Sequence, residues 1–404
     1  MDAGGSKQQA SSGGDEHLTV DAELAVRPLM SKIALFDLTY TQLKEMLTSW
    51  GEPSYRADQL WGWLYRSLIT DFEGMTNLPK ALRGRLKERA ILETLRPLEE
   101  TVSADGLTRK TLFRLRDGGT LSRSAAREGS GIELVDGRDS ASNQTIESVL
   151  MLYGKRRTVC ASVQVGCAMG CPFCATGQMG FVRNLTPGEI IEQVLYFARQ
   201  LRANGDGRVT NVVLMGMGEP MANYENTWQA IETLNHPKGF NLGARRITIS
   251  TVGLVPGIER LSREKLQVGL AVSLHAPTDE LRDQLVPINR RYPLAELMAA
   301  CRRYVKRTGR RITFEYALMD GINDSLKQAR QLAKLLKGLL CHVNLIPLNP
   351  VAGSPYRPSP KGRVLEFEAE LRRLGIPTTL RMSRGIDIQA GCGQLRQRAR
   401  RRFG

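Results

Sequence analysis

The chain has 404 residues, of which 42% are hydrophobic, 24% charged and 6% aromatic. This composition is typical of globular proteins and excludes collagen-like, disordered and small disulfide-stapled chains. At roughly 150 residues per domain the length allows two or three domains, although a single α/β barrel can occupy more than half of it. No apolar run reaches the roughly 18 to 20 residues that span a bilayer, which excludes an integral membrane protein.

The charge of the chain is strongly positive. Lys and Arg outnumber Asp and Glu by 57 to 41, which gives a formal net charge of +16. Residues 1–30 have a net charge of −3, so the remaining residues hold +19. Such a field favours a polyanionic partner, although scattered Lys and Arg also serve solubility. Five arginines between Arg396 and Arg402 could lie along phosphates or simply solvate the terminus.

The cysteine count and the N-terminus predict a cytoplasmic protein. Seven cysteines, an odd number, do not suit a secreted disulfide framework. Residues 1–30 are rich in Gly, Ser and Ala, lack the apolar segment of a secretion signal and contain acids that an organellar presequence avoids. They predict a disordered tail.

Two regions are expected between this tail and the α/β core. In residues 31–100 the apolar side chains recur at spacings of three and four, which predicts a small helical domain. Residues 101–157 predict a strand-rich connection, because polar and apolar residues alternate between 102 and 115. Within it, residues 122–144 are rich in Gly, Ser, Arg and Asp and predict an exposed insertion loop.

Residues 158–395 predict an α/β core, followed by a basic tail at 396–404. Short apolar runs alternate with amphipathic helices, and Thr186–Glu189 is a capping box with Pro at the first helical position. Six such units predict a partial (β/α)6 barrel with functional residues at the carboxyl ends of its strands. The predicted strands are 161–165, 211–215, 246–250, 269–274, 312–318 and 342–348, and later helices are predicted over 294–308, 326–337 and 363–374.

Three cysteines follow the first predicted strand in a C-x3-C-x2-C pattern: Cys167, Cys171 and Cys174. Three thiolates can hold a [4Fe–4S] cluster and leave one iron free for a substrate or cofactor, whereas electron-transfer clusters are closed by four. Two alternatives stay open at this point. One is a Cys3His zinc site, and the other is a cysteine-rich turn in the core. The candidate histidines for zinc are His236, His275 and His342.

The cysteine pattern after the first strand of a β/α repeat resembles the radical S-adenosylmethionine (SAM) superfamily. That resemblance implies a [4Fe–4S] cluster whose open iron binds SAM. The segment Gly216–Pro220 follows the second strand and resembles the superfamily's GGEP segment, which contacts the SAM amino group. Alone, this segment would be an ordinary strand-to-helix turn.

Further segments narrow the resemblance to the bacterial dual-specificity methyltransferases that act on carbon 2 of an adenine in 23S rRNA and in tRNA. The similarity covers most of residues 35–395. The segments that carry it, in chain order, are Phe36–Leu38, Tyr55–Leu60, Ile146–Val149, Cys160, Cys174–Gln178, Ser273–Ala276, Arg384–Gly385 and Ala390–Leu395.

The resemblance implies roles for three residues outside the cluster. Cys392 accepts a methyl group from one SAM, and a radical from a second SAM activates that methyl for addition to adenine, because carbon 2 is too electrophilic for direct methylation. Glu147 then removes the carbon-2 proton, and Cys160 releases Cys392 through a transient disulfide. Without the resemblance, Cys160 would be a buried apolar residue and Glu147 a solvated one.

The same resemblance implies a set of SAM contacts, which lie at predicted carboxyl ends of strands, as a barrel active site requires. Taken alone, His275 could equally be a hydrogen-bonded core histidine, and Ser250 and Asn349 could be turn residues. The implied contacts are Gly218, Glu219, Ser250, Ser273, Leu274, His275 and Asn349. Cys301 and Cys341 match nothing in the family and are expected to pack in the barrel.

The implied partners are 23S rRNA, tRNA and an electron donor such as flavodoxin or ferredoxin, with the protein a monomer by default. An unstacked adenine in a single-stranded loop is the least costly target for a buried site. Three other readings stay open: the sister enzyme that methylates carbon 8, a zinc-stabilised RNA-binding protein without catalysis, and a radical SAM enzyme that acts on a peptide.

Overall fold

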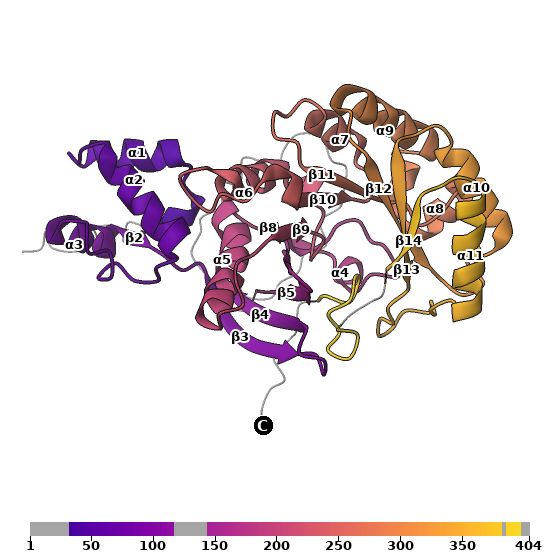
Figure 1. Ribbon diagram of the computed structural model, residues 1–404, viewed down its shortest axis with the longest axis horizontal. Helices are drawn as coiled ribbons and strands as arrows, with labels where there is room; N and C mark the ends of the chain where they lie inside the picture. Colours follow the sequence, from indigo (N-terminus) through magenta and orange to yellow (C-terminus); the bar gives the residue numbers. More distant parts are fainter. Residues whose placement is uncertain (1–31, 117–143, 382–384, 397–404) are drawn as a thin grey trace, which may run out of the picture. The chain divides into compact units, whose positions relative to one another are not determined.

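The computed structural model describes residues 32–116, 144–381 and 385–396, which belong to one compact unit (Figure 1). The predicted tail 1–30, almost all of the insertion loop 122–144 and the basic tail from residue 397 lie outside these residues. Within them, no helix is long and apolar enough to cross a bilayer.

The N-terminal part of the described chain is helical, as the apolar spacing predicts. Its core holds Trp61 and Tyr65, whose ring centroids are 4.4 Å apart. The amide of Gly188 donates to Asp37 Oδ1 at 2.8 Å, which joins this region to the core. A short parallel pair, β1 (Ile33–Ala34) and β2 (Ala90–Ile91), brings its two ends together. The helices are η1 (Leu35–Asp37), α1 (Tyr40–Ser49), α2 (Tyr55–Gly62), the π-helix η2 (Trp63–Ser67) and α3 (Lys80–Arg89).

A ten-stranded sheet forms the core, in the order β14-β13-β12-β11-β10-β9-β6-β5-β4-β3. The strands from β14 to β6 are parallel, and β5, β4 and β3 continue the sheet in antiparallel pairs. Residues from β9 through β13 line one cavity, so the sheet curves into the predicted partial barrel. The strands are β3 (Leu95–Val102), β4 (Thr108–Leu115), β5 (Thr145–Tyr153), β6 (Arg156–Cys160), β9 (Asn211–Leu214), β10 (Ile247–Thr251), β11 (Gly269–Ser273), β12 (Ile312–Leu318), β13 (Cys341–Pro347) and β14 (Thr378–Leu380).

The prediction for the first barrel strand was wrong. Residues 161–165 are not a strand of the main sheet, because that place is taken by β6, which pairs in parallel with β9. The chain then leaves the sheet and forms β7 (Gln164–Gly166), which pairs only with β8 (Phe181–Asn184). This small hairpin encloses the three-cysteine loop. The seventh parallel strand, β14, was not predicted, since it has only three residues.

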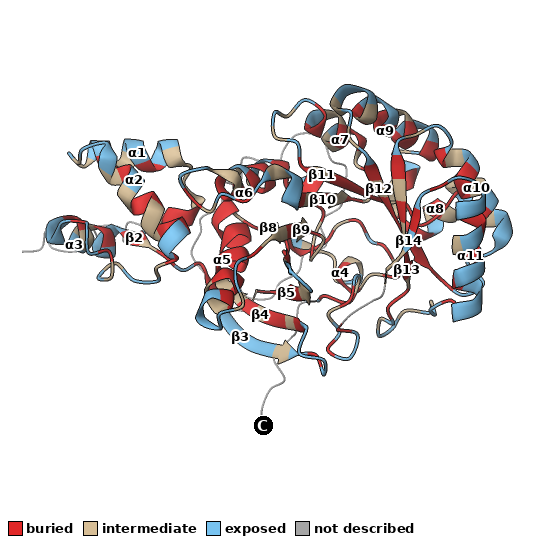
Figure 2. Cartoon of the chain, in the orientation of Figure 1, coloured by how far each residue is buried: buried red, intermediate tan, exposed pale blue. Residues whose placement is uncertain are grey.

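Helices connect the parallel strands and leave the inner face of the sheet for the site. Thr186 is the N-cap of α5 and forms the predicted capping box: its hydroxyl accepts from the amide of Glu189, and the Glu189 carboxylate accepts from the amide of Thr186. Figure 2 shows that β11 and β12 are largely buried, whereas β3 and the outer faces of α9 and α11 are exposed. The helices are α5 (Pro187–Ala203), α6 (Tyr224–Asn235), α7 (Val255–Leu261), α8 (Asp279–Leu285), α9 (Leu294–Thr308), α10 (Leu326–Leu336) and α11 (Lys361–Arg373).

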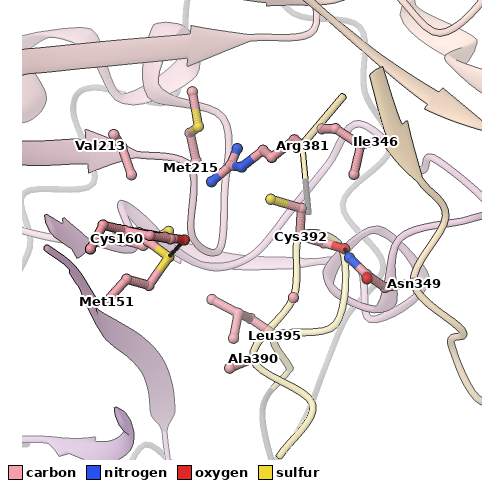
Figure 3. A pocket seen from close by; sticks show the side chains of 12 residues that line it. Met151, Cys160, Val213, Met215, Ile346, Asn349, Arg381, Ala390, Cys392 and Leu395 are labelled. Carbon is pink, nitrogen blue, oxygen red and sulfur yellow. Dashed lines mark hydrogen bonds between the residues drawn. The ribbon is translucent and has the colours of Figure 1, made fainter. Parts of the chain in front are cut away.

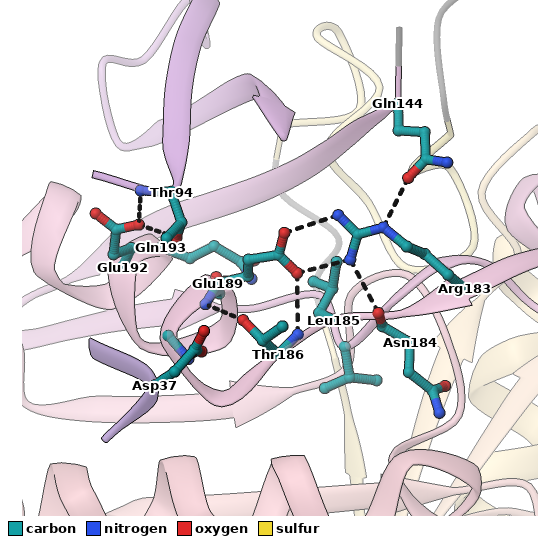
Figure 4. Close-up of polar contacts among 12 residues, drawn as sticks. Asp37, Thr94, Gln144, Arg183, Asn184, Leu185, Thr186, Glu189, Glu192 and Gln193 are labelled. Atoms are coloured by element: carbon teal, nitrogen blue, oxygen red, sulfur yellow. Dashed lines mark hydrogen bonds and ion pairs between the residues drawn. The ribbon is translucent and has the colours of Figure 1, made fainter. Parts of the chain in front are cut away.

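A buried carboxyl on α5 gives a pH-dependent stability. Glu192 is 2% exposed and accepts hydrogen bonds from the amide and hydroxyl of Thr94 (Figure 4). Burial raises the pKa of Glu192 to about 8. The folded state therefore favours the protonated form of Glu192. The contribution of Glu192 to the free energy of unfolding is complete at pH values below its pKa in the unfolded chain, and it is lost as the pH rises towards 8.

We expect the free energy of unfolding to fall less between pH 5 and pH 8 in Glu192→Gln than in the wild-type protein, by about 1–3 kcal/mol. Urea unfolding at both pH values measures the difference. Glu366→Gln, an exposed substitution with the same loss of charge, should retain the wild-type pH dependence. Equal pH dependence in the wild type and Glu192→Gln would contradict the explanation.

Candidate active site

The three cysteines of the loop lie at one end of the parallel strands. Cys167 follows β7, and Cys174 immediately precedes the short helix α4 (Ala175–Gln178). Together with Cys171 they line a cavity of about 1010 Å³, a volume that includes space open to solvent. Cavities of roughly 300–1,000 Å³ hold small-molecule ligands and cofactors.

The donor set fits an iron–sulfur cluster better than a single zinc ion. Among the described residues, no three His, Cys, Asp or Glu side chains converge on one metal position. The three cysteines instead line a wider cavity, and the cysteines that hold an iron–sulfur cluster each bind a different iron. Burial raises the pKa of Cys167 to about 12 and also raises the pKa of Cys171 and Cys174, so the thiolates need a metal charge for stabilisation.

The histidines do not complete a zinc site. His236 stacks on Tyr40 of α1 with centroids 4.9 Å apart, and His342 lies at the start of β13, opposite the carboxyl ends of the strands. His275 does line the cavity, but its Nδ1 accepts from the amide of Ala317 at 3.0 Å. Burial lowers the pKa of His275 to about 3, so it is neutral and carries its proton on Nε2.

The segment after β9 brings a carboxylate to the cavity. Glu219 is 2% exposed, and its two oxygens accept from the amides of Met221 and Val252, each at 2.9 Å. Burial raises its pKa to about 7. Gly218 precedes it with φ of +99°, in the left-handed region that favours glycine.

Most of the predicted SAM contacts come together around the cavity. Ser250, Ser273 and Asn349 join Gly218, Glu219 and His275 in its lining, from the ends of β10, β11 and β13 and the segment after β9. Leu274 does not: its side chain is fully buried in the core, and its amide already donates to the Glu315 carbonyl at 3.0 Å.

A second, smaller cavity of about 530 Å³ contains Cys160 and Cys392. Figure 3 shows them on opposite sides, with Arg381 pointing into the gap between them. Both thiols are free; Cys160 is buried at the end of β6 and Cys392 is exposed. Burial raises the pKa of Cys160 to about 12, and the nearby Cys392 adds to this effect. Cys392 also lines the first cavity, so it stands where the two meet.

Hydrogen bonds hold the loop that carries Cys392 against the barrel. The Cys392 carbonyl accepts from Asn349 Nδ2 at 3.0 Å, and the Gly393 carbonyl accepts from the amide of Ala175 at 2.8 Å. One residue further, Thr176 donates to the Leu395 carbonyl at 2.6 Å. Because Ala175 and Thr176 directly follow Cys174, the loop is tied to the three-cysteine segment itself.

Glu147 lies close to these cysteines but outside both cavities. It is 1% exposed on β5, forms an ion pair with Lys110 at 3.2 Å and accepts from the amide of Arg396 at 3.0 Å. Lys110 also donates to the Gln389 carbonyl at 3.1 Å. The buried pair therefore fastens both ends of the Cys392 loop to β4 and β5.

Comparisons with known proteins agree with this geometry. Residues 33–92 match the ribosomal RNA large subunit methyltransferase N-terminal domain, and residues 161–333 match the radical SAM superfamily. A probable dual-specificity RNA methyltransferase RlmN from Chloroflexus aurantiacus is 50% identical, over 91% of this chain and 93% of its own length. The relative of the same description from Moorella thermoacetica is 49% identical, over 91% and 98%. This chain belongs to the RlmN family.

The solved structures agree. The crystal structure of a radical SAM methyltransferase from Sphaerobacter thermophilus has a TM-score of 0.83 and 54% identity, and it covers 91% of this chain and 100% of its own. The predicted radical SAM fold is therefore confirmed. As a member of the RlmN family, the chain is a SAM-dependent RNA methyltransferase whose cofactors are a [4Fe–4S] cluster and SAM.

Three charged residues in or near the RlmN-type site lie outside every motif found in the sequence. Arg381 lines both cavities, and its pKa is raised chiefly by the Cys392 thiolate. Glu315 lies in the middle of β12 and faces the larger cavity. Arg282 is fully buried under the cysteine loop, where its guanidinium donates to the carbonyl of Leu274 and to Asn289. For Glu315 the one available signal was a charged residue within an apolar strand.

Gly218 can be tested for its conformational requirement. A Cβ at this position would lie 2.5 Å from Gln164 Cβ and 2.8 Å from the backbone nitrogen of Gln164. We expect Gly218→Ala to cost about 2–4 kcal/mol of stability, because it combines strain with displacement of Gln164. Gly106→Ala, with φ of +69° and no atom within 4 Å of the added Cβ, should cost about 1 kcal/mol from the conformation alone. Urea unfolding of both variants checks the difference, and equal losses would contradict the role of the clash.

Proposed function

We propose that this chain methylates carbon 2 of an adenine in 23S rRNA and in tRNA, with Cys392 as the methyl carrier. The observation that carries the proposal is the position of Cys392 at the junction of two cavities. One cavity contains the three cysteines of the loop, and the other contains Cys160. A carrier thiol has to reach both a methyl source and a second thiol that releases it.

The cofactors belong in the larger cavity. Cys167, Cys171 and Cys174 would be the three ligands of the cluster, which leaves one iron for SAM. When bound, the cluster and two SAM molecules per turnover supply the methyl group and the 5′-deoxyadenosyl radical that activates it. Around them, Glu219 and the neutral His275 offer an acceptor and a donor for polar groups of SAM.

Cys392 takes the methyl group on its sulfur by displacement, as a thiolate. Arg381 lines the same cavity and brings a positive charge beside the reacting sulfur. After the methyl carbon has bonded to adenine, Cys392 holds the RNA covalently. Its exposure is consistent with this, since an RNA base has to reach the sulfur.

Cys160 releases the product. Its sulfur bonds to the sulfur of Cys392 while the bond from Cys392 to the methyl carbon breaks, and that carbon keeps the electron pair and takes up a proton. The disulfide is then reduced by an external reductant. The electron donor of the enzyme is of the flavodoxin or ferredoxin class. The buried thiol must first lose its proton, and Arg381 is the nearby cation that favours this.

Glu147 is the proposed base for the carbon-2 proton. Its carboxylate now accepts from the amide of Arg396 and pairs with Lys110. To reach an adenine in the cavity, the Glu147 carboxylate has to give up its hydrogen bond from the Arg396 amide. The end of the Cys392 loop must therefore shift when RNA binds.

The RNA partner agrees with the charge of +16, and the target adenine must leave its stack to reach Cys392. We assign residues 31–100 to an accessory RNA-binding domain, 101–157 to a connection with its insertion loop at 122–144 and 158–395 to the catalytic barrel. The protein is proposed to act as a cytoplasmic monomer.

The position of the methyl group tests the function. Transcripts of 23S rRNA and tRNA, treated with the reduced enzyme and SAM, are digested to nucleosides and compared by mass spectrometry with 2-methyladenosine and 8-methyladenosine. The proposal predicts 2-methyladenosine from both RNAs. Formation of 8-methyladenosine instead would assign the chain to the alternative chemistry.

A further inference from the structure

Arg282 on α8 is a fully buried cation whose hydrogen bonds all go to neutral groups. Its Nε donates to the Leu274 carbonyl at 3.2 Å and its Nη1 to Asn289 Oδ1 at 2.9 Å, while Nη2 donates to the carbonyls of Val252 and Ser273. Among the described residues, Arg282 forms no ion pair. Burial of a charge is costly unless an opposite charge lies nearby, so this cation requires an explanation.

Two carboxylates reach Arg282 only through Asn289. Asn289 Nδ2 donates to Asp279 Oδ1 at 2.9 Å and to Asp283 Oδ1 at 2.7 Å, whereas its Oδ1 accepts from the guanidinium. Both acids are partly exposed, and solvent weakens the effect of their charges on a buried group. The described part of the protein therefore gives the guanidinium no direct counter-charge.

The three-cysteine loop packs against the same helix. Cys171 shares an apolar cluster with Leu285, the last residue of α8, and with Val286, which follows it. Burial lowers the pKa of Arg282 to about 10, and the Cys171 thiolate opposes this effect more strongly than Asp279 does. The guanidinium is still protonated at neutral pH, so it brings a permanent positive charge to the cysteine loop.

We propose that the iron–sulfur cluster is the counter-charge of Arg282, and that Arg282 raises the reduction potential of the cluster. This inference rests on the part of the proposed function that assigns Cys167, Cys171 and Cys174 as the cluster ligands. A cluster held by three thiolates is anionic, and it becomes one unit more negative when it takes one electron from the external donor, with no covalent bond formed or broken. A buried cation stabilises the more negative form, because net charge is one of the properties that set the potential of a cluster.

A redox titration of the anaerobic holoenzyme tests this role, without SAM or RNA and with the electron paramagnetic resonance signal of the reduced cluster as the readout. Arg282→Gln removes the charge. We expect the ratio of reduced to oxidised cluster at a given potential to fall about tenfold, which is a shift of about 59 mV to more negative values. Arg307→Gln, which removes an exposed arginine from α9, should keep the wild-type potential.

The sign of the shift separates the charge of Arg282 from its hydrogen bonds. Loosening of the strand ends alone would admit water, which stabilises the more negative form of the cluster and raises the potential. Arg282→Lys, which keeps a cation but loses the forked hydrogen bonds, should have a lower melting temperature and a potential closer to that of the wild type. An unchanged or higher potential in Arg282→Gln, or equal shifts in both variants, overturns the proposal.

Asp283→Asn applies the same test while Arg282 and its hydrogen bonds stay in place. The new amide oxygen can still accept from Asn289, and the charge of Arg282 is then less compensated, so the potential should rise. An unchanged or lower potential in Asp283→Asn contradicts the proposal even where Arg282→Gln does not fold. A wild-type holoenzyme that gives these shifts without methylating RNA would overturn the proposed function and leave the role of Arg282 standing.

Discussion

Replacing Cys160 by alanine is expected to stop the enzyme with RNA attached to Cys392. Cys392 can still accept a methyl group and join it to adenine, because Cys160 takes no part in those steps. Release needs a second thiol, and the other cysteines outside the loop, Cys301 and Cys341, line neither cavity. Turnover should fall by about 10³-fold or more, as for loss of a covalent participant.

A denaturing gel with labelled RNA measures this outcome directly. Cys160→Ala should give a band of protein-linked RNA that resists heat and denaturant, while the wild type gives free methylated RNA. Cys301→Ala is the matched control, since it removes a buried thiol from α9, and it should behave as wild type. Free methylated RNA at the wild-type rate from Cys160→Ala would contradict the resolving role.

Replacing Cys171 by alanine is expected to remove the cluster and all methylation. Among the described residues, the cavity is lined by the three cysteines of the loop and by the proposed methyl carrier Cys392, and loss of one loop cysteine leaves too few protein ligands to retain the cluster. Iron content should fall about tenfold or more, in line with the loss of a metal ligand. Methylation of Cys392 should disappear with it, because SAM then lacks its iron site.

Iron analysis and RNA methylation are measured on the same anaerobic preparation. Cys341→Ala provides the control, since it removes a buried thiol at the start of β13 and should keep iron and activity. Its thermal unfolding, compared with that of Cys171→Ala, shows whether cluster loss has also unfolded the protein. A Cys171→Ala protein with full iron content would contradict the assignment of the ligands.

Local signals in the sequence predicted much of the fold. The capping box at Thr186 depends on residues three positions apart, and the structure confirms it. The helix at 294–308 was predicted with the bounds that the structure has, because its apolar spacing is regular and Gly309 ends it. The same reasoning could not locate the first strand. The run 161–165 is apolar and buried, whereas β6 begins with two arginines, the first of them exposed, and only the pairing with β9 shows which segment is the strand.

The site was predictable where a motif fixes the spacing of its residues. One short segment predicts the three cysteines, and a second predicts Gly218 and Glu219. Arg381 and Glu315 have no such segment, because β14 and β12 bring them to the cavity through the register of the sheet. The position of Glu147 behind the Cys392 loop also depends on long-range packing, through Lys110 and the amide of Arg396.

The most direct test of the account is mass spectrometry of the peptide that contains Cys392, from protein purified with its cluster intact. A methyl carrier at Cys392 predicts one methyl group on this residue, which is absent when Cys167, Cys171 or Cys174 is replaced by alanine. An unmodified Cys392 in an iron-loaded protein that still methylates RNA would contradict the methyl-carrier role.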